Sequence, residues 1–550
     1  MGIKEITIRN FKCFNGDFHL TLHPSLNILV GDNESGKSTI LQAIHLALSG
    51  YYCGNNIRKI LTPYLFNKKA VDDYLKSLQK SESHLSPPEV IIQLVFNKEC
   101  PEFEGKNNLD KTNEISGITF KIAFDEKYKL EYRKLMEEGV YSLPLEYYSV
   151  SWTSFAGAKI TTYSIPFKSV FIDSSTYHYQ NGSDVYISRL VRDCLDEEDI
   201  MEIRRAHRLM IDEFSKNEII SQINDKISKS SNAIVHEVGL KANQGNINAW
   251  EKDVAMHVKE IPFMFIGKGK QCVLKTELAL NHEKAQKAAI ILIEEPESHL
   301  SYSNLNILIR AIQDKYDDKQ ILISTHSSFV ANKLGLNNLI LLRNHRTTKI
   351  KDLNAASYFA VLPGYDTLRY ILCRKAILVE GASDELVVQR AYRDNHDGKL
   401  PIEDGIDVIA VQGLSFLRYL EIADKLHIKT AIVSDNDGDY EAVKRKYVDY
   451  LGDNKKEYVD ICIDSNIDTG DLKIGNKQFN YNTLEPKLLK ENSIQLFNDI
   501  FGKSYKNEEE LFNYMQKNKT ECALKIFNSS QKIKYPNYIM KAVKSCLLYT

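Results

Sequence analysis

The run Gly31–Ser38, GDNESGKS, carries the strongest chemical pattern in this 550-residue chain, because it fits GxxxxGK[ST]. In such a loop, glycines let backbone N–H groups close around phosphate oxygens, Lys37 supplies a cation to the β- and γ-phosphates, and the Ser38 hydroxyl helps to hold Mg²⁺. The competing interpretation is a chance turn, but an apolar strand precedes the loop and an amphipathic helix follows it. The expected nucleotide-contacting residues are Asn33, Gly36, Lys37, Ser38 and Thr39.

Two adjacent carboxylates, Glu294 and Glu295, end the apolar run of IILIEEPESHL. At the end of a buried strand, Glu294 is expected on the metal side through water, and Glu295 is expected to polarise the attacking water. His326 ends another apolar run, ILIST, and is expected to sense the γ-phosphate. The competing interpretations are acids that satisfy a helix N-terminus and a histidine with a structural role.

A second group of acids lies further along the chain. Glu380-Gly381 follows the run AILV, Asp384 comes three residues later, and Asp435 and Asp437 follow TAIVS in the sequence DNDGD. Because side chains at i and i+2 share a face of a strand, Asp435 and Asp437 are expected to point at one cation. Oxygen ligands suit Mg²⁺ or Mn²⁺, and no His/Cys spacing in the sequence competes for zinc. Taken alone, DNDGD is also typical of a surface turn.

These side chains must be positioned by strands, and the apolar runs of the sequence predict such strands. Leu26–Val30 predicts a strand before a helix at Ile40–Leu48, and Ala288–Ile293 and Gln320–Ser324 predict central, fully buried parallel strands. After about Tyr370 strand and helix alternate, which predicts a second, separate parallel α/β domain whose acidic loops meet at the carboxyl ends of neighbouring strands. The predicted order is strand 376–379, helix 384–392, strand 407–411, helix 416–425 and strand 430–434.

The remaining segments predict the organisation around those strands. Ile3–Arg9 alternates as a half-buried strand does, residues 55–167 are rich in strand patterns, and residues 186–257 show helical spacing. The mild composition shift at 352–366 marks the expected junction between the domains. The sequence contains no 20–50-residue repeat.

Composition excludes several classes of protein. With 43% hydrophobic and 26% charged residues the chain is expected to fold, and its length predicts two or more domains of roughly 100–200 residues. A formal net charge of −2 means that contact with nucleic acid would depend on local patches. Nine dispersed cysteines favour reduced thiols, and the absence of a signal core or long apolar run predicts a soluble cytoplasmic protein without membrane contact.

The phosphate loop, the Glu294-Glu295 pair, His326 and the opening IRNFKCF together resemble the ABC-type ATPase head of the structural-maintenance, Rad50 and RecF groups. The resemblance implies that ATP is the nucleotide and that two protomers sandwich it, with a signature loop of one completing the site of the other. Gly267–Gln271, ahead of a helix at Leu274–Leu280, is the best match to that signature, although it departs from Ser-Gly-Gly-Gln. Arg9 and Asn10 fall where that group touches nucleotide, and Gln180 is a candidate for its glutamine loop.

The Glu380-Gly381 and Asp435-x-Asp437 motifs resemble the TOPRIM domain, and an ABC-type head followed by TOPRIM resembles the OLD family of nucleases over essentially the whole chain. This resemblance implies a further carboxylate, Glu485, in a Thr-Leu-Glu context, and a phosphate-facing lysine, Lys534, for which Lys541 and Lys544 are alternatives. It implies DNA cleavage by two cations. The implied ligands are Glu380, Asp384, Asp435, Asp437 and Glu485.

The expected architecture is α/β: an ABC-type ATPase head with a helical dimerisation insert, then a TOPRIM domain. The expected bounds are 1–185 and 261–360 for the head, 186–260 for the insert and 370–550 for TOPRIM. The expected partners are double-stranded DNA and a second copy of the chain. The family resemblance adds antiphage defence, with a helicase-like protein or a retron reverse transcriptase and its DNA as possible partners.

Two other functions stay open at this point. A topoisomerase or a primase-like factor would use TOPRIM for other chemistry. A topoisomerase needs a nucleophilic tyrosine, and the sequence does not indicate which of its 30 tyrosines that would be. A primase of the bacterial type needs a Cys/His zinc module, which this sequence does not contain. A non-catalytic clamp of the structural-maintenance kind needs long heptad arms, for which the segment 186–257 is far too short.

Overall fold

The computed structural model divides the chain into two compact units. The first comprises Met1–His326 and Ile340–Thr347, and the second Ser327–Leu339 and Thr348–Thr550. Of the predicted junction at 352–366, only Asp366 lies within the described residues. The structure describes residues 2–53, 55–78, 85–109, 111, 115–138, 142–173, 179–180, 183–184, 197–230, 240–242, 250, 257–281, 288–298, 300–313, 319–343, 345–350, 366–412, 416–474 and 477–545.

A five-stranded antiparallel sheet forms one layer of the first unit. Its first strand follows the expected alternation only in part, because Ile6 and Ile8 are fully buried but Thr7 between them is buried too. The strand order is β2 (Asp17–Thr21), β1 (Ile3–Arg9), β6 (Val90–Phe96), β7 (Gly117–Phe124) and β8 (Tyr148–Ser154).

The second sheet of this unit has parallel strands at its centre. The apolar runs that predict buried strands are its β3, β15 and β14, and every residue of β3 and β15 is buried. The order is β17 (Arg346–Lys349), β16 (Leu339–Arg343), β3 (Leu26–Gly31), β15 (Gln320–Ser324), β14 (Ala288–Glu294) and β9 (Lys168–Asp173). Gln320 joins the two sheets, because its side-chain amide accepts from the backbone N–H of Ile3 and donates to the backbone oxygen of Ile3, both at 2.7 Å.

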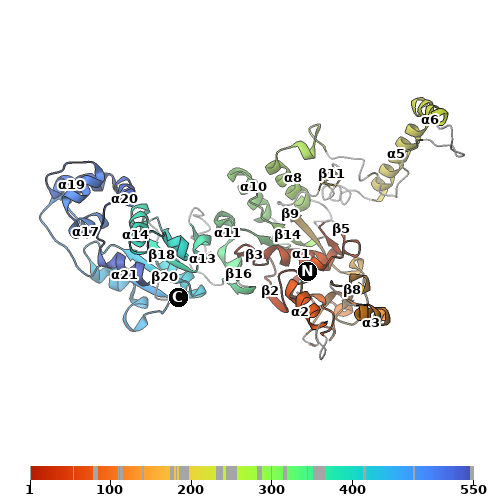
Figure 1. Cartoon of the computed structure of the whole chain (residues 1–550), viewed down its shortest axis with the longest axis horizontal. Coiled ribbons are helices and arrows are strands. Elements are labelled where there is room, and N and C mark those ends of the chain that lie inside the picture. The colour runs from red at the N-terminus through yellow and green to blue at the C-terminus, as the bar shows by residue number, and fades with distance from the viewer. Residues whose placement is uncertain are drawn as a thin grey trace. The chain divides into compact units, whose positions relative to one another are not determined.

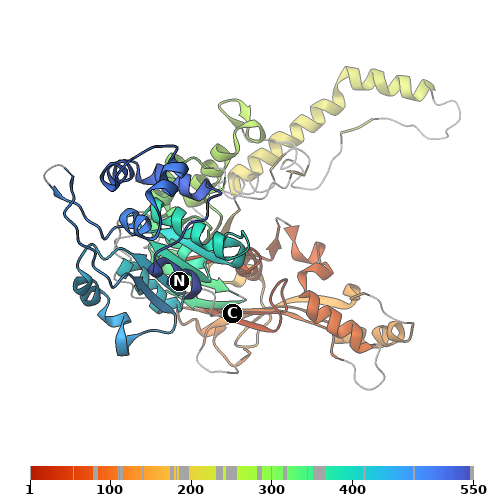
Figure 2. The same cartoon turned by 60° about the vertical axis from the view of Figure 1, so that its left-hand side comes forward.

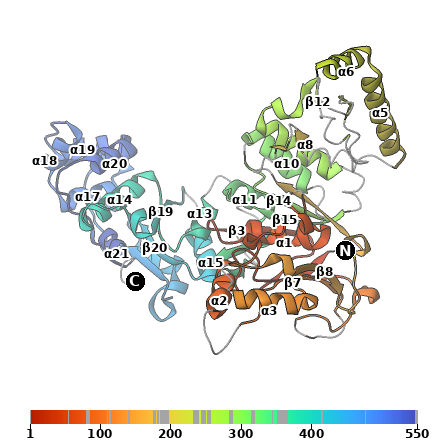
Figure 3. The same ribbon diagram turned by 45° about the vertical axis from the view of Figure 1, so that its right-hand side comes forward.

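Helix α1 (Lys37–Ser49) follows β3 directly and lies between the two sheets (Figure 3). Ile40, Leu41 and Ile44 are fully buried, because apolar residues lie on both sides of this helix. The Trp152 indole N–H of β8 donates to the Ala47 carbonyl at 2.8 Å and so ties the antiparallel sheet to the helix. The phosphate-loop helix is therefore part of the core of this unit.

Two successive helices, α5 (Glu197–Lys216) and α6 (Glu218–Ser230), occupy part of the predicted insert (Figure 2). They expose large apolar side chains, among them Leu209 and Phe214, which are more than half accessible. Residues 186–196, 231–239, 243–249 and 251–256 of the predicted insert lie outside the described residues. Dimerisation through this segment stays a prediction.

Helix α8 (Lys268–Asn281) begins six residues before the predicted start at Leu274. The prediction was wrong here because Gln271 stabilises an earlier first turn: its buried side-chain amide donates to the carbonyl oxygens of Phe263 and Ile266 at 3.0 and 2.8 Å. Most of the signature-like run Gly267–Gln271 is therefore helix. Helix α10 (Tyr302–Gln313) follows β14.

The second unit contains a four-stranded parallel sheet, in the order β19 (Ile406–Ala410), β18 (Lys375–Val379), β20 (Lys429–Ser434) and β21 (Val459–Ile463). The predicted alternation of strand and helix is present, with α14 beside β18 and α21 beside β20 (Figure 1). The helices around the sheet include α14 (Ala382–Asn395), α15 (Phe416–Leu426), α16 (Tyr440–Lys446), α17 (Leu484–Glu491), α18 (Ile494–Phe501), α19 (Glu508–Lys517), α20 (Lys519–Asn528) and α21 (Asn537–Ser545).

Across the parts of the chain that the structure describes, no helix combines the length and the apolar character needed to span a membrane.

Candidate functional site

The loop between β3 and α1 has the form that a phosphate-binding loop needs. Two of its glycines are required by close approach: a Cβ on Gly31 would lie 2.3 Å from the Leu342 carbonyl oxygen, and one on Gly36 would lie 2.6 Å from the Phe14 ring. Gly36 also has a φ of 106°, which L side chains rarely adopt. The glycines therefore set the turn that directs the first backbone N–H groups of α1 toward the loop.

Lys37 lies inside this loop and is satisfied by its backbone. Its Nζ donates to the carbonyl oxygens of Gly31 at 3.0 Å and Asp32 at 2.8 Å. Burial lowers the pKa of Lys37, while Glu295, Asp32 and Glu294 oppose that shift. The Ser35 hydroxyl is buried and has no hydrogen-bond partner within the described residues. A buried hydroxyl and a buried ammonium in one loop fit the oxygen atoms of a phosphate.

The remaining predicted residues of this loop differ in exposure. Asn33 is exposed, Ser38 is half-buried and Thr39 is buried in the first turn of α1. The Cys13 thiol lies 3.5 Å from the Thr39 hydroxyl. Arg9 is bound elsewhere, since its guanidinium forms an ion pair with Asp17 at 2.5 Å.

The carboxylate pair and the histidine meet at the ends of neighbouring strands. Glu294 is buried at the end of β14, and Glu295 follows it with a φ of 43° and a backbone N–H bonded to the Ser324 carbonyl. One carboxylate oxygen of Glu295 lies 3.8 Å from His326 Nε2. Burial and the charge of Lys37 lower the pKa of His326 against the opposing charges of Glu295 and Asp32, which favours the neutral imidazole. The structure thus brings Lys37, Glu295 and His326 into one electrostatic neighbourhood.

Glu297 is a member of this site that the sequence analysis missed. Its Oε1 accepts hydrogen bonds from the Thr325 hydroxyl and the His326 backbone N–H, both at 2.8 Å. Burial raises the pKa of Glu297, and its Oε2 is buried without a hydrogen-bond partner within the described residues. The one feature of the sequence that could have indicated Glu297 is its position two residues after Glu295. Glu297 joins the turn after β14 to the segment that carries His326.

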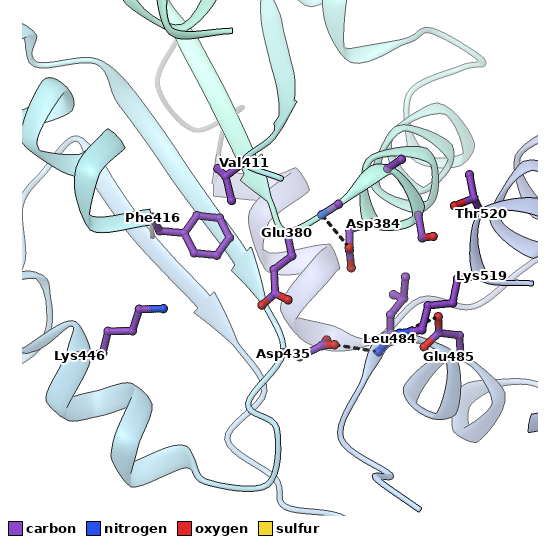
Figure 4. A pocket seen from close by; sticks show the side chains of 13 residues that line it. Glu380, Asp384, Val411, Phe416, Asp435, Lys446, Leu484, Glu485, Lys519 and Thr520 are labelled. Atoms are coloured by element: carbon purple, nitrogen blue, oxygen red, sulfur yellow. Dashed lines mark hydrogen bonds and ion pairs between the residues drawn. The ribbon is translucent and has the colours of Figure 1, made fainter. Parts of the chain in front are cut away.

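In the second unit, four of the five predicted acidic ligands line one cavity of about 550 Å³. Glu380 follows β18, Asp384 lies in the first turn of α14, Asp435 follows β20 and Glu485 lies in the first turn of α17 (Figure 4). Because β18 and β20 are neighbouring parallel strands, their carboxyl ends bring the two acidic loops to the same edge of the sheet.

Hydrogen bonds hold three of these carboxylates in place. Glu380 accepts from the Ser434 hydroxyl at 2.5 Å, and Asp384 accepts from the Gly381 backbone N–H at 3.2 Å. Asp435 accepts from the Leu484 backbone N–H at 3.1 Å through one oxygen and from the buried Tyr538 hydroxyl at 3.3 Å through the other. Tyr538 has no counterpart among the predicted residues, because its contact with Asp435 joins positions that are 103 residues apart.

The acids raise one another's pKa. Burial, together with the charges of Glu380 and Glu485, raises the pKa of Asp384 to about 6. Burial and the charges of Asp384, Glu380, Glu485 and Asp437 raise the pKa of Asp435 well above its ordinary value. Such repulsion is what a cation between carboxylates relieves. As the side chains stand, no three His, Cys, Asp or Glu residues of the described segments converge closely enough to coordinate an ion.

Two predicted residues of this site are placed differently. Strand β20 ends at Ser434 and Asp437 has a φ of 48°, so the expectation that Asp435 and Asp437 share a strand face is wrong. Asp437 is exposed, accepts from the Asn480 side-chain amide at 3.2 Å and is not among the residues that line the cavity. Lys534 is exposed before α21 and is also absent from the cavity lining. The lysines that do line it, Lys446 and Lys519, were not predicted.

Models of known protein families match three segments of this chain. An AAA ATPase domain family matches residues 1–180, and a further AAA domain family matches residues 278–332. The family described as overcoming lysogenization defect protein-like, TOPRIM domain, matches residues 371–437.

Individual relatives show how far these similarities extend. Endonuclease GajA of Bacillus cereus (strain VD045) is 21% identical over 571 residues, covering 97% of this chain and 93% of its own. DNA replication and repair protein RecF of Lactococcus lactis subsp. cremoris (strain MG1363) is 48% identical over 50 residues, only 14% of the length of RecF and 9% of this chain. Among solved structures, the SMC head domain from Thermotoga maritima aligns over 64% of this chain and 99% of its own, with 13% identity and a TM-score of 0.29.

Proposed function

We propose that this chain, an OLD-family protein in which an AAA-type ATPase domain precedes an OLD-like TOPRIM domain, is a metal-dependent endonuclease that cleaves double-stranded DNA under the control of its nucleotide site. The observation that carries the proposal is the cavity lined by Glu380, Asp384, Asp435 and Glu485. Four carboxylates that three segments of the chain bring together and that repel one another form a costly arrangement. A function that needs concentrated negative charge explains why the fold keeps it.

Divalent cations fit this donor set by chemistry. Carboxylate oxygens are the ligands that Mg²⁺ and Mn²⁺ prefer, and the raised pKa of Asp384 and Asp435 reflects burial together with neighbouring negative charge. Glu380, Asp384, Asp435 and Glu485 would hold the cations, and Asp437 stays a predicted ligand next to them. When bound, two such cations stabilise the attacking and leaving oxygens of an in-line displacement at a phosphodiester.

The chain's own residues orient these ligands. Tyr538 and the Leu484 backbone N–H fix both oxygens of Asp435, and Ser434 fixes Glu380. In the hydrolysis, a water oxygen forms a bond to phosphorus, the bond from phosphorus to one sugar oxygen breaks, and that oxygen takes up a proton. A role for Lys534 at the phosphate stays a prediction.

For the ATPase domain, the proposed ligand is ATP with Mg²⁺. Lys37 would exchange its two backbone carbonyl partners for phosphate oxygens, and Ser35 would gain the partner that it lacks. Ser38 would help to hold the cation, with Glu294 on the same side through water. Glu295 would polarise the attacking water. The His326 imidazole would form a hydrogen bond at the γ-phosphate and so sense its presence.

The wider role follows from the family. We propose that two or more copies associate through their ATPase domains and the α5–α6 segment, and that the protein acts in antiphage defence. A helicase-like protein or a retron reverse transcriptase with its DNA is the proposed class of further partner.

The test is incubation of supercoiled plasmid with the purified chain and Mg²⁺ or Mn²⁺, with and without ATP. Nicked or linear product is expected from the wild type, and Asp435→Ala is expected to lose at least about 10³-fold in rate, because it removes a cation ligand. Asp439→Asn is the matched control. It lies four residues later, outside the cavity, and an asparagine keeps the side-chain oxygen that caps α16 by accepting from Ala442 N–H. Relaxed topoisomers in place of nicked product, or full cleavage by Asp435→Ala, would contradict the proposal.

A further inference from the structure

Two lysines line the cavity of the second unit in addition to its four carboxylates. Lys446 is the last residue of α16 and Lys519 is the first residue of α20. Figure 4 shows them on opposite sides of Glu380 and Asp435. The cavity therefore has an acidic middle and a cation at either side.

Lys446 is held by aromatic rings. Its ammonium lies 5.7 Å from the centre of the Phe416 ring and 5.2 Å from that of the Tyr447 ring. Within the described part of the chain it forms no ion pair with a carboxylate, in contrast to Lys444 on the same helix, which pairs with Glu441 at 2.6 Å. Cation–π contacts hold an ammonium group in place without neutralising its charge, so Lys446 keeps its full attraction for an anion.

Lys519 faces the cavity from the other side. It pairs with Glu485 at 3.6 Å, and its side chain is half exposed, so the pair is long and screened. Thr520, the next residue, also lines the cavity. The preceding Asn518 does not cap the helix with its side chain, which donates to the Tyr514 carbonyl instead. A threonine hydroxyl and uncapped backbone N–H groups thus lie beside Lys519, and all of these groups suit a phosphate oxygen.

The formal charge of the cavity indicates a role for Lys446 and Lys519. Four carboxylates and two ammonium groups leave the cavity with a formal charge of −2 when every group is ionised, which repels DNA. Two divalent cations would neutralise the four carboxylates, and Glu485 would then no longer need Lys519. The two lysines would be left as the surplus positive charge at either side of the reacting phosphate.

We propose that Lys446 and Lys519 bind the backbone phosphates on the two sides of the scissile phosphate, so that the cavity takes a DNA strand that continues in both directions. This inference rests on the proposed nuclease function and deepens it, because it explains cleavage inside a strand. An enzyme that removes nucleotides from an end needs a phosphate contact on one side only.

The first experiment measures DNA binding as a function of salt, with the full chain, a fluorescent duplex oligonucleotide and Ca²⁺ in place of Mg²⁺ to prevent cleavage. Each of Lys446→Gln and Lys519→Gln is expected to lower the slope of log affinity against log salt by about 0.9, so the variant loses about 3.5-fold less affinity than the wild type between ~50 and ~200 mM salt. Lys444→Gln on α16 and Lys525→Gln on α20 are matched controls, because both lysines pair with acids outside the cavity.

The second experiment places the contacts. A duplex cut by the wild type at one mapped position is prepared with a neutral methylphosphonate at the linkage on either side of that position. Each methylphosphonate is expected to raise the KM of the wild type about threefold and to leave kcat nearly unchanged. The KM of the lysine variant that has lost the same phosphate contact should not rise further. The methylphosphonate that leaves the KM of Lys446→Gln unchanged must lie on one side of the cut position, and the one that leaves the KM of Lys519→Gln unchanged on the other.

The outcomes separate the inference from the function on which it rests. If the wild type does not cut DNA, the proposed function fails. If it cuts, and the lysine variants keep the wild-type salt slope or respond equally to both methylphosphonates, the inference fails and the nuclease assignment stands. A loss of kcat in Lys519→Gln without coupling to a methylphosphonate would show that Lys519 only balances the charge of Glu485, and would overturn its part of the proposal.

Discussion

The two candidate sites of this protein handle charge in opposite ways. At the nucleotide loop, the Lys37 ammonium group donates hydrogen bonds to two backbone carbonyl oxygens of its own loop. In the carboxylate cavity, burial and the mutual repulsion of acids from three segments of the chain raise the pKa of Asp384 and Asp435. The Lys37 ammonium group thus has hydrogen-bond partners without a ligand and exchanges them on binding, whereas the carboxylates of the cavity repel one another until a cation binds. Ligands are therefore expected to stabilise the second unit more than the first.

Removing Lys37 tests the first half of this contrast and should have the largest effect. Lys37→Ala is expected to weaken ATP binding by at least about 100-fold, because no other described lysine or arginine donates to the carbonyl oxygens of this loop and the phosphates would lose their buried cation. Titration calorimetry with ATP and Mg²⁺ measures it. Lys59→Ala, at an exposed lysine of the same unit, is the control, and unaltered ATP affinity in Lys37→Ala would refute the phosphate-loop assignment.

Neutralising Asp435 tests the second half. Asp384 has a folded pKa of about 6, above the ~3.9 of an unfolded aspartate, and the pKa of Asp435 is shifted in the same direction. The folded state therefore binds more protons, so this contribution to stability is present below about pH 4 and is lost as pH rises through about 6. Asp435→Asn is expected to raise the melting temperature of the metal-free protein at pH 7.5 by roughly 2–4 °C. The melting temperature of the variant should also fall less steeply than that of the wild type as the pH rises from about 5 to 8.

Thermal unfolding with and without Mn²⁺ measures both effects. The wild type is expected to gain stability from Mn²⁺ at pH 7.5 and much less at pH 5, where protons compete for the carboxylates. Asp435→Asn should lose most of that gain, and Asp439→Asn should keep it. A metal-free Asp435→Asn variant that melts below the wild type would show that the hydrogen bonds of Asp435 outweigh its charge repulsion.

Truncating Glu297 is expected to have the smallest effect and sharpens the comparison within the first unit. Glu297→Ala leaves the Thr325 hydroxyl and the His326 backbone N–H without their acceptor, which costs about 1–3 kcal/mol in the free energy of unfolding. Urea denaturation measures this cost, and the ATP hydrolysis rate should fall severalfold because His326 is less well positioned. Glu297→Gln keeps an accepting oxygen and is the control. Equal losses in both variants would mean that the charge of Glu297, and not its hydrogen bonds, is what matters.

Local sequence signals account for what could be predicted. The phosphate loop, β3, β14, β15 and the alternating elements of the second unit are all encoded by short runs in which apolar pattern and turn chemistry agree. Asp437 was misplaced because the end of β20 depends on a left-handed backbone that no alternation pattern reveals. Lys446, Lys519 and Tyr538 were missed for a different reason: only tertiary packing brings α16, α20 and α21 to the acids, and surface lysines resemble one another in sequence.

The order of strands in the first unit also bears on how the protein is made. Strand β3 near the start of the chain pairs with β15, and the backbone of Ile3 bonds to the side chain of Gln320 across 317 positions. At roughly 5–20 residues per second, a ribosome needs about 16–63 s to proceed from Ile3 to Gln320. During that interval the edge of β3 that pairs with β15 has no neighbouring strand. The nascent chain must therefore wait with an unpaired strand, and chaperones that shield such edges are expected to matter more for this unit than for the second.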